Sequence, residues 1–242
     1  MLSAAEKSKR FHTWFFPITF VFVLWVVKLC EVVFHLELYQ WGLFPRQIKG
    51  LGGVLLAPLL HGDLSHLFSN SLPLLVLGAG LFYFYRPIAY KVFLFLYLTT
   101  GIWVWFAARP AYHIGASGVV YGLASFLFFS GLIRRNKYLM AFSLFIVFLY
   151  GSLIWGILPL EAGISWESHL LGAIAGVVSA FHFRKIGLQK EVVQWEDEPE
   201  DALENSDEPP YWMEQQSDAQ QEQQAPTIHY HYQETKDKPP LP

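Results

Sequence analysis

Residues 116–133 read ASGVVYGLASFLFFSGLI, a composition typical of a helix in a membrane. No side chain in these 18 residues carries a charge. The whole chain has the same character, because 53% of its 242 residues are hydrophobic, 17% are aromatic and only 15% are charged. Its mean hydropathy is +0.31, whereas soluble domains carry about 25% charged residues. We therefore predict an integral membrane protein.

Six apolar runs are long enough to cross a bilayer, whose core needs about 20 apolar residues per helix, or somewhat fewer where helices pack in protein. The first run is too long for a signal-peptide core and no A-x-A-like site follows it, so we expect it to remain as an anchor. The sequence predicts an all-α polytopic membrane protein with a bundle of six transmembrane helices. The expected spans are residues 12–34, 66–85, 89–108, 116–133, 138–158 and 167–183.

Basic residues give the expected orientation, since they gather on the cytoplasmic side of membrane proteins. Six spans place both termini on one side, and we expect that side to be the cytoplasm. Lys28 is not counted because it lies within the first span, where we expect its side chain to reach toward the interface. The absence of an evident organelle presequence favours a bacterial plasma membrane. The orientation follows from the counts of basic residues on the two sides. The side of the termini has eleven, namely Lys7, Lys9, Arg10, Arg86, Lys91, Arg134, Arg135, Lys137, Arg184, Lys185 and Lys190, and the other side has three, namely Arg46, Lys49 and Arg109.

Charge divides the chain near residue 186. Residues 1–185 carry 14 Lys and Arg against 6 Asp and Glu, a net charge of +8, whereas residues 186–242 carry 3 against 14, a net charge of −11. The second region is acidic and rich in Gln and Pro, with few residues that could build a core. We expect a cytoplasmic N-terminus over 1–11, a six-helix domain over 12–185 and a disordered cytoplasmic tail over 186–242. The acidic runs of this tail could recruit a cytoplasmic partner.

Residues 36–65 are aromatic and glycine-rich, but no part of this stretch is long and uniform enough to span a bilayer. We interpret it as an outer loop that lies partly in the membrane interface, where Trp41, Leu43 and Phe44 would act as anchors. The alternative is an ordinary surface loop.

Four polar side chains fall at one depth of the predicted bundle. The second, fourth and sixth spans run in the same direction, which places His66 and Asn70, then Ser117, then His169 near the outer start of their helices. Polar groups within a membrane are costly, so each is a candidate for function. A rise of about 1.5 Å per residue puts Ser117 and His169 within the first turns of their spans.

Small residues predict that the fourth and sixth spans pack closely. Gly118 and Gly122 form one G-x-x-x-G pattern, and Gly172 and Gly176 form a second. Residues at this spacing share a helix face and allow two backbones to approach in lipid. His169 lies on the same face as Gly172 and Gly176, because the three residues are separated by three and four positions.

A serine beside a histidine on a neighbouring helix is the minimum arrangement for nucleophilic acyl transfer. His169 would take the hydroxyl proton of Ser117 and return it to the leaving amine. Gly115 and Gly118 would leave room for a substrate backbone. The helix N-terminus would add amide donors and a positive dipole end where negative charge develops.

Two further groups fit supporting roles. His66 and Asn70 are four residues apart on one helix face, and both can donate hydrogen bonds to an oxyanion. Tyr121 lies one turn beyond Ser117 and could stack on the His169 ring. Asp63, Glu161 and Glu167 fall in expected outer loops, so no carboxylate within a span completes a triad.

Each of these residues also has a structural interpretation. A serine at a helix N-terminus is commonly a cap, and Asn and His in membranes often serve only to join helices. His61 and His113 border the proposed site and could shape its mouth, but loop histidines are usually solvated, so they receive no catalytic role. A small transporter would instead place charged or broken helices near the midplane. The joint placement of Ser117 and His169 favours catalysis.

Three motifs lie in order on the second, fourth and sixth spans, namely HGDLSHLFSN (61–70), GASGVVYG (115–122) and SHLLGAIAG (168–176). Together they resemble the signature of the rhomboid intramembrane serine proteases, and the resemblance covers roughly residues 12–185. It implies that Ser117 is the nucleophile, His169 the general base, His66 and Asn70 the oxyanion pair, and Tyr121 the aromatic residue that packs beside the histidine.

The same resemblance implies an endopeptidase that works in the lipid bilayer without cofactors or a metal. Its substrates would be single-span membrane proteins cut near the outer membrane boundary, and nucleic acid is not an expected partner. They would pass laterally by the fifth span and a capping loop, here residues 109–116 or 159–166. The alternative is a non-catalytic relative that binds transmembrane segments, although such proteins usually lack the serine or the histidine.

Overall fold

The computed structural model describes residues 4–149, 156–159 and 163–186, all within one compact unit. In these ranges the regular secondary structure is helical, apart from one isolated antiparallel bridge between Leu43 and His113. The predicted tail over 186–242 lies outside the described residues except for Ile186. The all-α polytopic fold expected from the sequence is therefore confirmed.

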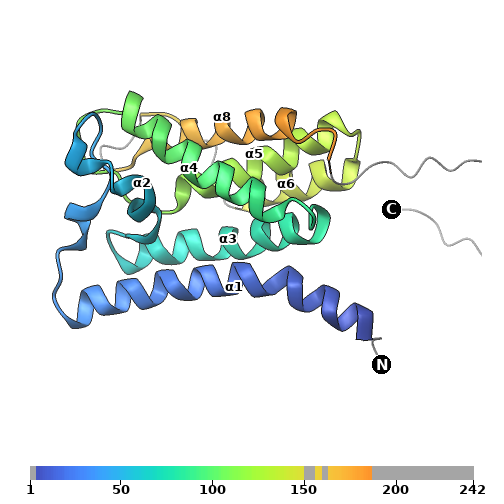
Figure 1. Ribbon diagram of the computed structural model, residues 1–242, viewed down its shortest axis with the longest axis horizontal. Helices are drawn as coiled ribbons and strands as arrows, with labels where there is room; N and C mark the ends of the chain where they lie inside the picture. Colours follow the sequence, from blue (N-terminus) through green and yellow to red (C-terminus); the bar gives the residue numbers. More distant parts are fainter. Residues whose placement is uncertain (1–3, 150–155, 160–162, 187–242) are drawn as a thin grey trace, which may run out of the picture. The chain divides into compact units, whose positions relative to one another are not determined.

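Within the part of the chain that the structure describes, six long helices form the bundle (Figure 1). The ends of four of them lie within two residues of the predicted spans, whereas the first begins earlier. The prediction for 138–158 was wrong at its end, because residues 156–159 form turns and a bend rather than helix. The helices are α1 (Ala4–Val33), α3 (Leu64–Phe84), α4 (Ala89–Ala107), α5 (Ser117–Ile133), α6 (Lys137–Leu149) and α8 (Trp166–His182).

Three of these helices are long and apolar enough to cross a membrane by length and composition. They are the apolar part of α1 over Phe11–Val33, and the whole of α3 and α4. Helices α5 and α8 have 17 residues each, which at about 1.5 Å per residue is slightly less than a hydrocarbon core of about 30 Å. The shorter helices lie where the bundle is packed most closely.

The glycine patterns bring α5 and α8 into backbone contact, as predicted. A Cβ on Gly172 would collide with the carbonyl oxygen of Gly118, and a Cβ on Gly176 would collide with that of Gly122. Because both pairs advance by four residues, the two helices run parallel. Ser117 and His169 therefore lie at the same end of the bundle.

Helix α1 lies along α3 (Figure 1), and polar contacts help to join them. The Trp25 indole donates to Ser71 Oγ at 3.0 Å. Lys28 is buried, and its Nζ donates to the carbonyl oxygens of His61 and Gly62, both at 2.9 Å, and pairs with Glu31 at 2.8 Å. We expected the Lys28 side chain to extend toward the interface, and its ammonium group binds the backbone of the turn that leads into α3.

The stretch 36–65 is more ordered than an interfacial loop and contains four short helical segments. Trp41 is exposed, as an anchor would be, but Leu43 is only 2% exposed and its expected role as an anchor was wrong. Leu43 packs against Val54 and Val104 in a small second core and pairs with His113. The segments are η1 (Leu38–Trp41), η2 (Ile48–Gly50), α2 (Gly53–Leu56) and η3 (Ala57–Leu59).

Arg134 joins the opposite ends of α5 and α8. One guanidinium nitrogen donates to the carbonyl oxygens of Phe183 and Ile186, at 2.9 Å and 2.6 Å, just after α8 ends. Another donates to Ser130 at 3.2 Å, and the guanidinium lies over the Tyr85 ring. A cation at a helix C-terminus is favourable because the last carbonyls have no partner within the helix.

Candidate active site

Ser117 is the first residue of α5 and lies two residues after a glycine that the backbone requires. Gly115 has a φ of +106°, which residues with a side chain rarely adopt, and its N–H donates to the Ala57 carbonyl at 2.8 Å. A Cβ at Gly115 would lie 2.7 Å from His66 Nε2, so the space there is also closed. Gly118 is similarly filled, by Thr100 and Ser168. The room that we expected beside these glycines is therefore occupied by protein groups.

His169 lies in the first turn of α8, and its ring meets the hydroxyl of Ser117. The distance from His169 Nε2 to Ser117 Oγ is 2.7 Å, and His169 is 8% exposed. The other ring nitrogen, Nδ1, lies 2.8 Å from the carbonyl oxygen of Gly156. A carbonyl can only accept, so in the neutral imidazole the proton sits on Nδ1. Nε2 then presents its lone pair to Ser117, which is the tautomer that a general base needs.

Two neighbours hold the imidazole in this orientation. The Tyr121 ring stacks on it with centroids 4.3 Å apart and an angle of 10° between the planes. A Cβ at Gly156 would lie 3.0 Å from His169 Nδ1 and would collide with the Tyr121 hydroxyl. Sequence reasoning found Tyr121 but missed Gly156, because a backbone carbonyl has no residue-type signature.

His66 and Asn70 lie at the start of α3, which begins after a capping residue. The Asp63 carboxylate accepts from the His66 backbone N–H at 2.7 Å, which satisfies one of the free amides of the helix end. Asn70 is buried and its Nδ2 donates to the His66 carbonyl at 3.1 Å. An amide nitrogen carries two hydrogens, so one remains to serve another acceptor.

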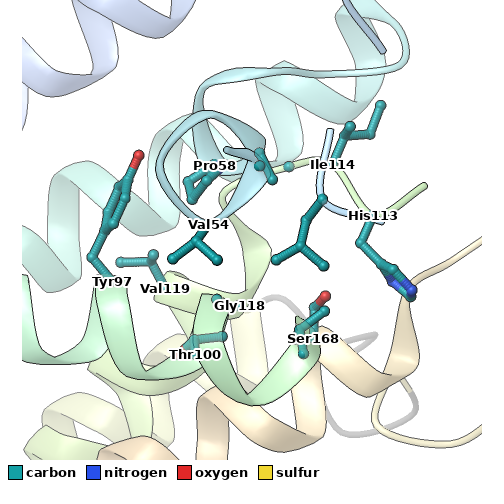
Figure 2. Close-up of a pocket in the computed structure, with 15 residues that line it drawn as sticks. Val54, Pro58, Tyr97, Thr100, His113, Ile114, Gly118, Val119 and Ser168 are labelled. Carbon is teal, nitrogen blue, oxygen red and sulfur yellow. The ribbon is translucent and has the colours of Figure 1, made fainter. Parts of the chain in front are cut away.

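Two cavities flank the start of α5. The larger has a volume of about 730 Å³ and is lined by Ser117, His169, His66, Asn70 and Tyr121, so the structure brings the proposed dyad, the oxyanion pair and the stacking tyrosine together. The smaller has a volume of about 30 Å³. Figure 2 shows Thr100, Gly118 and Ser168 around it, from α4, α5 and α8. Gly172 and Gly176 line neither cavity and act in helix packing.

His61 and His113 are both buried, unlike the usual loop histidine, and His113 lines the larger cavity, as expected of a residue that borders the site. His61 lies edge-on to the His66 ring, with centroids 5.1 Å apart. Burial, together with the nearby His66, lowers the pKa of His61 to about 4, since a charged ring is unfavourable out of water. His61 is therefore neutral at physiological pH and supports His66 as a packing partner.

We expected Glu167 to lie in an outer loop, and the structure differs. Glu167 lies in the first turn of α8 and is 5% exposed. Its Oε1 faces Arg109, 3.4 Å from the backbone nitrogen and 3.6 Å from Nε. Among the hydrogen bonds of the described residues, the partner of His169 Nδ1 is the Gly156 carbonyl and not this carboxylate.

Comparison with known proteins shows the family to which the chain is similar. Residues 49–186 match the model of the Rhomboid domain. An uncharacterized protein of Mycobacterium bovis and one of Mycobacterium tuberculosis are each 36% identical over 178 residues, which cover 68% of this chain and 72% of the relative. An uncharacterized protein of Mycobacterium leprae is 32% identical over 179 residues, which cover 68% of each chain.

Proposed function

This chain belongs to the rhomboid family, the family of intramembrane serine proteases, and from that premise we propose that it is a serine endopeptidase that cleaves single-span membrane proteins. The observation that carries the proposal is the 2.7 Å separation of Ser117 Oγ and His169 Nε2, with the proton of the imidazole fixed on the opposite nitrogen. A serine at a helix start is commonly only a cap, whereas a base within hydrogen-bond reach of the hydroxyl is what activates it as a nucleophile.

The chemistry follows from these positions. Ser117 Oγ attacks the carbonyl carbon of the substrate amide while His169 Nε2 takes the hydroxyl proton. The oxyanion that forms is stabilised by His66, by the free N–H of Asn70 and by the amides at the start of α5. The C–N bond then breaks, and His169 returns the proton to the leaving amine. Water attacks the acyl-enzyme by the same route and releases Ser117.

The location of the site suggests where substrates are cut. Ser117, His66 and His169 lie at the first turns of three helices, so a substrate must present its amide near one boundary of the membrane. The expected orientation, with both termini in the cytoplasm of a bacterial cell, places this boundary on the outer side. A substrate helix must unwind to expose its amide, which favours small or helix-breaking residues near the cut.

A fluorophosphonate probe tests the proposal without knowledge of the substrate. We expect the purified protein in detergent or lipid to be labelled at Ser117, as shown by mass spectrometry of the modified peptide, and we expect Ser117→Ala to remain unlabelled. Labelling elsewhere, or none in either environment, would contradict the assignment and favour a non-catalytic protein that binds transmembrane segments.

The oxyanion pair gives a second expectation. Asn70→Ala and His66→Ala should each lower kcat by about 10²- to 10³-fold, because each removes a donor that strengthens as charge develops on the substrate oxygen. The substrate KM should change little. Leu72→Ala, an exposed position on the same helix, is the matched control. An Asn70→Ala enzyme with the wild-type kcat would remove Asn70 from the oxyanion site.

A further inference from the structure

A second polar cluster lies beside the proposed dyad and is not used by the chemistry above. It joins the loop over 108–116, which leads into Ser117, to the segment over 163–168, which leads into His169. His113 Nδ1 lies 2.5 Å from Ser165 Oγ, and Ser165 Oγ lies 2.6 Å from Ser168 Oγ. His113 is 3% exposed. We call His113, Ser165, Ser168, Arg109 and Glu167 the polar clasp.

The hydrogen bonds of the clasp have a fixed direction. His113 Nε2 lies 3.1 Å from the Arg109 carbonyl, which can only accept, so Nε2 carries the proton. Burial lowers the pKa of His113, which keeps the ring neutral. Nδ1 must then accept from the Ser165 hydroxyl, and Ser165 in turn accepts from Ser168. In this row of hydrogen bonds every donor has one acceptor. The side chains of His113, Ser165 and Ser168 therefore have little freedom to rotate.

Arg109 and Glu167 reinforce the same junction. The Arg109 guanidinium donates to the Ile164 carbonyl at 2.9 Å. The buried Glu167 carboxylate faces both the backbone nitrogen and Nε of Arg109. A buried carboxylate is costly unless it is paired, so breaking this pair would leave Glu167 with an uncompensated charge.

The clasp lies beyond the paired glycines of α5 and α8. That pairing begins with Gly118 and Gly172, which Ser117 and His169 precede along their helices. Before that pair, the contact of Gly118 with Ser168 joins α5 to a residue of the clasp itself. The first turn of a helix has no partners for its N–H groups and frays unless other groups tie it down. The opposite ends of α5 and α8 are held by Arg134, too far away to fix the dyad.

We propose that the polar clasp is a positioning device that sets the separation of Ser117 Oγ and His169 Nε2, with His113 and Ser165 as its central positioning residues. The expected effect of the clasp on reaction rate rests on the proposed function, whereas its expected effect on structure does not. The clasp gives His113 and Glu167 a structural role, in which they exchange no protons with the dyad.

The rate of fluorophosphonate labelling measures the effect. Ser165→Ala breaks the chain, and we expect the maximal rate of labelling to fall roughly 10- to 100-fold, the effect of a small misplacement of reacting groups, with little change in the probe concentration for half-maximal rate. Ser165→Thr keeps the hydroxyl and should retain the wild-type rate. The control is Ser143→Ala, which removes a buried serine hydroxyl that donates to Leu139 in α6.

A double-mutant cycle separates positioning from general destabilisation. His113→Phe should also slow labelling, and combining it with Ser165→Ala should add little, since both break the same chain. Additive losses, a wild-type rate in Ser165→Ala, or equal losses in Ser165→Ala and Ser143→Ala would each overturn the proposal.

Hydrogen exchange gives a readout that does not depend on activity. In Ser165→Ala we expect faster exchange at the backbone amides of residues 113–120 and 165–172 together, and unchanged exchange around Arg134. If wild-type protein is not labelled but this paired increase occurs, the proposed function fails while the clasp stands. If wild-type protein is labelled and no paired increase occurs, the clasp fails alone.

Discussion

Replacing Ser117 by alanine is expected to abolish cleavage of a single-span substrate in reconstituted vesicles. Loss of the nucleophile in soluble serine proteases costs on the order of 10⁶-fold in kcat, so the variant should show no product above background. The variant should nevertheless fold. The helix cap at this end is Ala116 and not Ser117, and alanine is the best helix former at interior positions.

Ser125→Ala is the matched control, because Ser125 lies on the same helix about two turns further from the site. It should cleave at a rate close to wild type. Measurement of product by gel and of folding by thermal unfolding in detergent separates chemistry from stability. Equal cleavage by wild type and Ser117→Ala would end the assignment of the nucleophile.

Gly172→Ala is expected to have the second largest effect, although it adds only one methyl group. That methyl would collide with the carbonyl oxygen of Gly118, and a main-chain atom of a packed helix cannot move aside as a side chain does. Overpacking of this kind costs about 1–3 kcal/mol of stability. The starts of α5 and α8 must also separate, so kcat should fall roughly 100-fold through misplacement of His169.

Gly52→Ala provides the comparison, because a Cβ at Gly52 would meet no atom within 4 Å. Thermal unfolding and steady-state cleavage of both variants measure the difference. If Gly172→Ala unfolds at the wild-type temperature and cleaves at the wild-type rate, the contact between α5 and α8 does not position the site.

Most of the bundle could be predicted because hydropathy and helix spacing act over many residues. The G-x-x-x-G patterns predicted the contact of α5 with α8, and the matching depth of Ser117 and His169 predicted that their side chains could meet. The end of the fifth span was wrong because composition stays apolar through residue 158, so hydropathy alone carries no signal for the turn at 156–159.

Other features depend on contacts between distant segments. The residue type of Leu43 suits the membrane interface, but its bridge to His113 and its packing against Val54 bury it. Sequence reasoning places His113 and Glu167 in loops. They are buried because the segment over 108–116 packs against the segment over 163–168. The sequence pattern of one segment carries no information about this contact, since each segment alone is typical of a loop.

The partner of His169 Nδ1 is a main-chain carbonyl, that of Gly156. In a triad the corresponding group is a side chain that one codon change can delete. Here no substitution removes the acceptor, so alanine scanning will pass over the group that selects the tautomer. Only chemistry on the peptide bond itself, such as replacement of the Gly156–Ile157 amide by an ester with a weaker acceptor oxygen, could reveal its contribution.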